Sequence, residues 1–158
     1  MVLKNNSIES EPGSDSLDIV TWEEKYATGI ELIDVQHREL VSLINELFRA
    51  CRMGNEVTGF VFKEAMSRMV EYVRFHFSAE QKLMERINYP ERHDHQKRHE
   101  SLIRDILAAA KDYNEGKKMV AHQFVRTLKD WVLGHIAVHD KIYAAYIMEL
   151  KKKGLFDG

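Results

Sequence analysis

Four long stretches of the chain carry apolar side chains at alternating intervals of three and four residues, and no proline interrupts them. Proline removes a backbone donor and clashes inside a helix, so proline-free stretches permit long helices. The spacing is that of one face of an α-helix, whereas a half-buried strand would show strict alternation. The pattern therefore predicts an all-α protein.

Pro90 and several glycines separate these stretches from one another. Glycines stand where helices could end, at Gly54, Gly59, Gly116 and Gly154. The predicted helices accordingly run near residues 33–53, 60–88, 91–114 and 118–152. Connections of a few residues favour antiparallel neighbours, so we expect an antiparallel up-down four-helix bundle with an N-terminal arm at residues 18–32.

The ends of the chain differ in composition from this predicted bundle. Residues 1–17 are rich in Ser, Glu, Asp and Asn, which is typical of a flexible tail or linker. We expect residues 18–153 to form one domain, because 158 residues are an ordinary length for a single domain. Residues 154–158 are expected to form a C-terminal tail.

Composition excludes several classes of protein. The single cysteine, Cys51, cannot form an internal disulfide, unlike the cysteines of small secreted scaffolds. The net charge of −2 gives no basic excess for binding nucleic acid. The longest apolar run, at residues 142–148, is far shorter than the roughly 20 residues of a membrane span. We therefore expect a cytoplasmic protein without membrane insertion and without a nucleic-acid partner.

Histidine and carboxylate side chains interrupt the predicted apolar faces. Five of the eight histidines lie on these faces, at His37, His76, His95, His99 and His135. Glu80 lies in the second face, and Asp140 lies one row beside the fourth. A buried carboxylate or imidazolium is costly unless it is paired or binds a metal ion. These side chains therefore require partners inside the bundle.

The fourth predicted helix offers two adjacent rows of residues. We expect the core row to be Phe124, Leu128, Trp131, His135, Val138, Ile142 and Tyr146. The row beside it is Val132, Ile136, Asp140, Tyr143 and Ile147. In an α-helix, residues five apart are about 140° apart around the axis. His135 and Asp140 are therefore not expected to point at one atom, but they can straddle a site wide enough for two metal ions.

Two pairs of these residues have the helical spacing of chelating side chains. His76 and Glu80, and likewise His95 and His99, are four residues apart, which is about 40° around a helix. In antiparallel helices, all seven side chains also lie toward the same end of the bundle. We therefore predict one shared metal site.

The chemistry of the donors favours iron at this site. Seven protein ligands exceed the usual four of zinc, and no thiolate lies at their level. Imidazole together with bridging carboxylate suits iron. Five imidazoles, two bridging carboxylates and a bridging oxo or hydroxo group supply eleven of the twelve bonds of two six-coordinate irons. The remaining position suits a small ligand such as O₂.

These residues lie in motifs that resemble those of the hemerythrin family, and of bacterial hemerythrins in particular. In chain order the motifs are Trp22, the segment GIELIDVQH ending at His37, HFSAE at 76–80, Tyr89-Pro90, the pair His95 and His99, and HIAVHD at 135–140. The similarity extends from about Ile19 to Lys151.

The resemblance implies a role for each ligand. It implies that one iron is held by His95, His99 and His135, that the other is held by His37 and His76, and that both are bridged by Glu80 and Asp140. The implied cofactor is two iron ions, Fe²⁺ or Fe³⁺, joined by these carboxylates and an oxo or hydroxo bridge. The implied activity is reversible O₂ binding, with NO or small anions as further ligands, by a carrier, store or sensor rather than an enzyme.

Side chains near the ligands predict the surroundings of the open position. An apolar O₂ pocket is expected from Leu40, Phe77, Trp131 and Val132. Gln81 stands where many family members have a second Glu, outside the expected ligand set. Gly134 is expected to permit close helix packing rather than an access channel. The remaining histidines are expected at the surface, at His93, His122 and His139.

Two other functions remain open on the sequence. A di-iron enzyme could handle peroxide or nitric oxide, although no additional acid or base is evident beside the open position. The chain could also be the O₂-sensory module of a longer signalling protein, with residues 1–17 leading to a signalling partner. Neutral imidazoles outnumber carboxylates five to two, a balance that favours reversible binding over onward oxidation.

Overall fold

The computed structural model describes the backbone of residues 18–52, 56–117 and 120–157, and all their side chains except those of 56–58 and 120. Its elements in chain order are a 3-10 turn η1 (Glu24–Tyr26), α1 (Glu31–Arg52), α2 (Glu56–Arg86), α3 (Arg92–Asn114), α4 (Val120–His135), a π-helical turn η2 (Ile136–Asp140) and α5 (Lys141–Lys152). The tail predicted at residues 1–17 lies outside the described residues.

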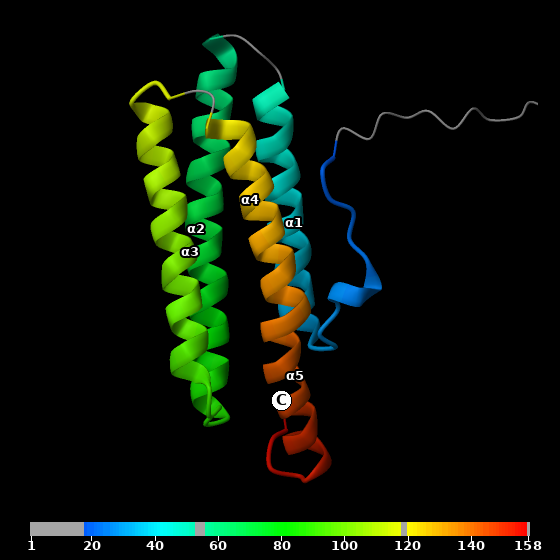
Figure 1. Ribbon diagram of the computed structural model, residues 1–158. Helices are drawn as coiled ribbons and strands as arrows, with labels where there is room; N and C mark the ends of the chain where they lie inside the picture. The colour runs from blue at the N-terminus through cyan, green and yellow to red at the C-terminus, as the bar shows by residue number, and fades with distance from the viewer. Residues whose placement is uncertain (1–17, 53–55, 118–119, 158) are drawn as a thin grey trace, which may run out of the picture.

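Four helical rods lie side by side in antiparallel order (Figure 1). The fourth rod is the continuous unit of α4, η2 and α5, and the connection between α2 and α3 lies at the end of the bundle where α1 begins. The part of the chain that the structure describes contains no strand. The predicted antiparallel four-helix bundle is therefore confirmed. None of the described helices combines the length and apolar character needed to cross a bilayer.

Local backbone conformations end two of the helices. After α2, Asn88 adopts a left-handed conformation with φ 49°, which turns the chain toward Pro90 and α3. Gly116, with φ 90°, follows the end of α3. Gly59 instead lies inside α2, so the expectation of a helix end there is wrong. A glycine in a helix costs only about 1 kcal/mol relative to alanine, which a long packed helix tolerates.

The N-terminal arm is tied to α1 by two buried polar side chains. The side-chain oxygen of Asn45 accepts hydrogen bonds from the N–H groups of Ile19 and Val20, and its amide donates to the Val20 carbonyl. The Asp34 carboxylate accepts hydrogen bonds from the turn just before α1. Because Asp34 lies one turn before His37, this anchoring also fixes the part of α1 that carries a predicted ligand.

The apolar core is divided in two along the bundle. The larger cluster fills most of its length and includes Leu47, Met69 and Leu128. The smaller cluster lies nearer the turn between α2 and α3 and consists of Met84, Ile87, Tyr89, Tyr143 and Ile147. Glu80 and Asp140 fall between members of the two clusters along their own helices. The predicted ligands therefore form a polar layer between two apolar clusters.

The buried face of the fourth rod differs from the predicted core row. Val138 and Ile142, expected in the core, are 52% and 48% exposed. The neighbouring row is buried in their place, with exposures of at most 1% at Ile136, Asp140, Tyr143 and Ile147. The prediction of one continuous core row is therefore wrong beyond His135. The buried row already includes Val125 and Val132 before η2.

Candidate metal centre

Seven buried polar side chains converge from all four rods. The five histidines and two carboxylates singled out in the sequence are each at most 5% exposed. They come from α1 (His37), α2 (His76, Glu80), α3 (His95, His99), α4 (His135) and η2 (Asp140). Their donor atoms form two groups, and within each group all atoms lie within 4.8 Å of one another. Both groups include the two carboxylates, so the structure brings all seven residues into one cluster.

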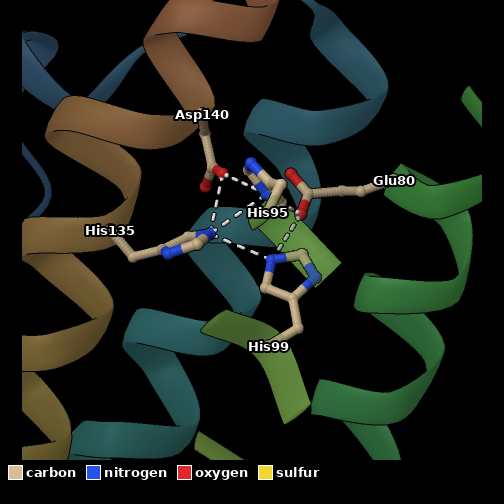
Figure 2. Close-up of side chains that lie close together, drawn as sticks. All are labelled: Glu80, His95, His99, His135 and Asp140. Carbon is tan, nitrogen blue, oxygen red and sulfur yellow. Dashed lines mark hydrogen bonds and ion pairs between the residues drawn. The ribbon is translucent and has the colours of Figure 1, made fainter. Parts of the chain in front are cut away.

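Three imidazoles meet on what we call the three-histidine side (His95, His99 and His135; Figure 2). The Nε2 atom of His135 lies 2.9 Å from that of His99 and 3.1 Å from that of His95. Two nitrogen atoms that bind one ion at about 2.1 Å and at a right angle lie about 3.0 Å apart. Both distances therefore match the spacing of adjacent ligands on one octahedral ion.

Two imidazoles form the opposite, two-histidine side (His37 and His76). Their rings meet edge to face, with centroids 4.9 Å apart. With the two carboxylates, this side offers four donor residues, whereas the three-histidine side offers five. The two sides therefore differ by one imidazole.

Each carboxylate reaches both sides. Oδ1 of Asp140 lies 3.1 Å from Nε2 of His135, and Oδ2 lies 3.1 Å from Nε2 of His37. Oε2 of Glu80 lies 3.2 Å from Nε2 of His99, and Oε1 lies 3.9 Å from Nε2 of His37. Carboxylates placed in this way can bridge two ions.

The π-helical turn brings Asp140 within reach of His135. The expectation that these residues could not meet at one atom is therefore wrong, although Asp140 also reaches the opposite side, as expected. A π-helix closes its hydrogen bonds over five residues, which brings residues five apart toward the same side of the helix. The separation of about 140° between residues five apart in a regular α-helix does not apply to this pair.

Several donor atoms of the cluster lack ordinary hydrogen bonds. Among the described residues, the buried polar atoms without a hydrogen-bond partner include both ring nitrogens of His37, Oε2 of Glu80 and both carboxylate oxygens of Asp140. Buried polar atoms in proteins are nearly always partnered. Nitrogen and oxygen atoms that face a common point without hydrogen bonds fit a site for metal ions.

The electrostatics of the cluster also favour a cation. Burial raises the pKa of Glu80 and Asp140, but the surrounding imidazoles lower it more, so both carboxyl groups have a pKa below the usual range. Burial lowers the pKa of His95, but the nearby carboxylates of Asp140, 3.2 Å away, and of Glu80 outweigh this effect and raise the pKa to about 9. For His99, burial dominates and lowers the pKa to about 4. The cluster therefore holds two carboxylates that remain ionised at neutral pH.

Comparison with known proteins identifies the family. The profile of the Hemerythrin HHE cation binding domain matches residues 28–147. The chain belongs to the hemerythrin family. Hemerythrin relatives cover most of its length: the bacteriohemerythrin of Pseudomonas aeruginosa is 32% identical over 124 residues, 78% of each chain. The bacteriohemerythrin of Stenotrophomonas maltophilia is 28% identical over 127 residues, 80% of each chain.

A solved structure of wild-type hemerythrin has the same fold as this hemerythrin chain. The two superpose with a TM-score of 0.74 at 24% identity, over 80% of this chain and 96% of the solved one. At this identity the similarity supports the fold alone. Together with the family, the buried cluster shows a hemerythrin-type metal-binding domain whose donors suit a di-iron site.

Two buried side chains that the sequence did not single out contact the hemerythrin cluster. Oε1 of Gln36 lies 2.9 Å from Nδ1 of His76. Because this oxygen can only accept, Nδ1 carries the proton and Nε2 turns its lone pair to the cluster. The Tyr143 hydroxyl donates to Oε1 of Glu80 at 2.8 Å. The sequence could have indicated these two residues only by their positions. Gln36 directly precedes His37, and Tyr143 lies in the same row as Asp140.

Aromatic rings pack directly on the three-histidine side of this hemerythrin. The ring of Phe77 stacks on His99 with centroids 3.5 Å apart and parallel planes. The indole of Trp131 stacks on His135 with centroids 4.6 Å apart and planes 9° apart. Two of the predicted pocket residues therefore contact imidazoles of the cluster directly.

A small cavity adjoins the cluster. The four residues predicted for the O₂ pocket all line it, namely Leu40, Phe77, Trp131 and Val132. His76, His135 and Asp140 line it as well. The volume available to the centre of a water-sized sphere in this cavity is about 10 Å³. One water molecule needs about this volume. The cavity therefore has room for one very small ligand.

Three further expectations have different outcomes. A Cβ added at Gly134 would meet no atom within 4 Å, so the expectation of close helix packing there is wrong. Gln81 donates to an exposed glutamate on the same helix and is not part of the cluster. His93 and His122 are exposed, as expected, but His139 is half-buried.

Proposed function

We propose that this hemerythrin binds O₂ reversibly at a non-haem di-iron centre. The observation that carries the proposal is the unequal division of donors, with five residues on the three-histidine side and four on the two-histidine side. The carboxylates are common to both, so the difference is one imidazole. An ion on the two-histidine side would have one protein ligand fewer and could accept a small ligand.

The proposed ligands follow the two groups of donor atoms. One iron would be held by His95, His99 and His135, the other by His37 and His76, and both by Glu80 and Asp140. When bound, two ferrous ions would supply the electrons on which reversible O₂ binding depends. The chain contributes by aiming five imidazole nitrogens and by holding both carboxylates between the two sides.

The cavity supports a small, uncharged ligand. His76 and His135 both line it, so it adjoins both sides of the cluster, the two-histidine side included. Apart from residues of the cluster, its walls are apolar: Leu40, Val73, Phe77, Leu102, Trp131, Val132 and Ile136. Walls of this kind exclude water and disfavour charged species. O₂ and NO satisfy both the size and the polarity of the cavity better than small anions do.

The donor set favours binding over oxidation chemistry. Five neutral imidazoles accompany only two carboxylates, and anionic ligands are the ones that stabilise ferric and higher states. Beyond the cluster itself, no acid or base lines the cavity to move a proton to a reacting group. These features support a carrier, store or sensor in preference to an enzyme.

The test is the optical response of the iron-loaded, reduced protein to O₂. We expect about two irons per chain and a visible absorption band that appears with O₂ and disappears when O₂ is removed. A metal-free sample serves as the control. Irreversible oxidation on first exposure, or sustained consumption of peroxide or NO with a reductant, would instead support a di-iron enzyme.

A sensory role requires that the ligand state alter contact with a partner. Proteolysis of residues 1–17 can be compared between the reduced and the O₂-exposed protein. A change in cleavage rate would support an O₂-sensory module with a signalling partner. Equal rates would support a carrier or store.

A further inference from the structure

Tyr143 is a fully buried tyrosine whose hydroxyl points into the cluster. The hydroxyl donates to Oε1 of Glu80 at 2.8 Å, and both side chains are 0% exposed. The ring belongs to the smaller apolar cluster, which fixes its position. Since α5 begins directly after η2, the π-helical turn that aims Asp140 also sets the direction of Tyr143 one turn later.

This hydrogen bond distinguishes the two oxygens of Glu80. Oε1, the acceptor, lies 3.9 Å from Nε2 of His37, whereas Oε2 lies 3.7 Å from Nε2 of His76. Oε2 lies 3.2 Å from Nε2 of His99 and has no hydrogen-bond donor among the described residues. A donated hydrogen bond withdraws electron density from the oxygen that accepts it, so Oε1 is the weaker donor to a metal ion.

We propose that Tyr143 is a positioning residue that weakens the donation of Glu80 through Oε1 and so favours the ferrous state of the centre. The inference rests on the proposed di-iron centre. Fe³⁺ gains more than Fe²⁺ from an anionic ligand because its charge is higher. A carboxylate oxygen that shares its charge with a phenol therefore favours Fe²⁺, and Tyr143 protects the reduced protein from oxidation.

Gln36 contacts a ligand of the two-histidine side. Its neutral amide oxygen accepts the Nδ1 proton of His76, which fixes the ring without adding a negative charge. A carboxylate in this position would make the imidazole a stronger donor and would favour Fe³⁺. The amide of Gln36 therefore raises the electron donation of His76 less than a carboxylate would.

The test compares two tyrosine-to-phenylalanine variants of the full iron-loaded chain. Tyr143→Phe removes the hydroxyl and keeps the ring, and Tyr89→Phe is the matched control in the same apolar cluster, with its ring centroid 6.2 Å away. For Tyr143→Phe we expect autoxidation about tenfold faster, with a reduction potential about 59 mV lower for a one-electron couple. Tyr89→Phe should match the wild type in both measurements.

A second variant reverses the sign of the effect. Replacing the residue at 143 with 3-fluorotyrosine keeps the ring and makes the hydroxyl a stronger donor, so the potential should rise. Circular dichroism of the metal-free variants checks their folding. Wild-type potentials in both Tyr143→Phe and the fluorinated protein, with the iron content unchanged, would overturn the inference. A wild type that takes up no iron or shows no O₂-dependent spectrum would contradict the proposed function instead.

Discussion

The two sides of the candidate centre are held in different ways. On the three-histidine side, aromatic rings stack on the imidazoles: Phe77 stacks on His99, and Trp131 stacks on His135. On the two-histidine side, the identified support is a hydrogen bond, from His76 to the amide oxygen of Gln36. One side is therefore held by stacked aromatic rings, and the other by a hydrogen bond and a tilted, unstacked contact between His76 and Phe77.

This difference in support suits the two sides to different roles, one to retaining its metal ion and the other to binding the ligand. Close packing leaves the three imidazoles little freedom, which suits an ion that keeps all its protein ligands. The two-histidine side has one imidazole fewer, and the cavity lies beside His76. We infer that the first side anchors the centre and that the second side carries its reactivity.

Removing a shared carboxylate should release iron from both sides of the centre, so the difference between the two sides should disappear. We expect Glu80→Ala to lower iron affinity by more than about 100-fold, since loss of an outer hydrogen-bond partner alone costs 10–100-fold. Iron content after gel filtration measures the effect. Glu85→Ala, at an exposed position on the same helix, should keep both irons. One iron retained in Glu80→Ala would mean that the two sides assemble independently.

Removing one imidazole from each side should affect the centre unequally. His76→Ala should lose the iron of the two-histidine side and keep about half of the total, because the five donors of the other side remain. His135→Ala should lose more, because it removes a ligand from the anchoring side. Iron analysis distinguishes these outcomes. Equal iron content in the two variants would contradict the division into anchor and reactive side.

Filling the cavity should alter reactivity without altering iron content. Val132 lines the cavity, and Val132→Leu adds one methylene group to a space of about 10 Å³. We expect several-fold slower autoxidation, because less room remains for water. The rate is measured from the decay of the O₂-dependent absorption. Val138→Leu, at an exposed position on η2, is the control. An unchanged rate in Val132→Leu would mean that the cavity is not the ligand pocket.

In the metal-free protein, the two imidazoles of α3 should have different pKa values. With a pKa of about 9, His95 stays protonated at neutral pH, whereas His99, with a pKa of about 4, is neutral. The stabilisation from His95 is therefore complete below its unfolded pKa of roughly 6.5 and is lost as the pH rises through about 9. Nitrogen-detected NMR titration measures both values. A pKa below 6.5 for His95 would contradict the arrangement of the carboxylates around it.

The smallest effect is expected at Gly134, an exposed position directly before His135. Because no atom lies within 4 Å of an added Cβ, Gly134→Ala should raise the free energy of unfolding, by about 1 kcal/mol. Urea denaturation measures the change, and O₂ binding should be unaffected. A loss of stability would show that the π-helical turn that follows requires glycine at this position.

Most of the cluster could be predicted because regular helices fix where side chains point. The four-residue spacing of His76 and Glu80, and of His95 and His99, holds in any α-helix, so their approach follows from the sequence. The fourth rod could not be predicted in the same way. Its two rows are both mainly apolar, and spacing alone does not show that the row with Asp140, rather than the row with Val138, is buried.

The supporting contacts depend on how separate helices lie against one another. The hydrogen bond from His76 to Gln36 joins α2 to α1, and that from Tyr143 to Glu80 joins α5 to α2. Contacts of this kind follow from helix rotation and register, which a periodic pattern fixes only within a single helix. Sequence reasoning therefore found the residues that converge and missed those that orient them.

The central claim is that the two-histidine side has one open position for O₂. The most direct test is a titration of the reduced, iron-loaded protein with known amounts of O₂, followed by removal of the gas. We expect one O₂ bound for every two irons, with full return of the reduced spectrum. A different ratio, or a spectrum that does not return when O₂ is removed, would contradict it.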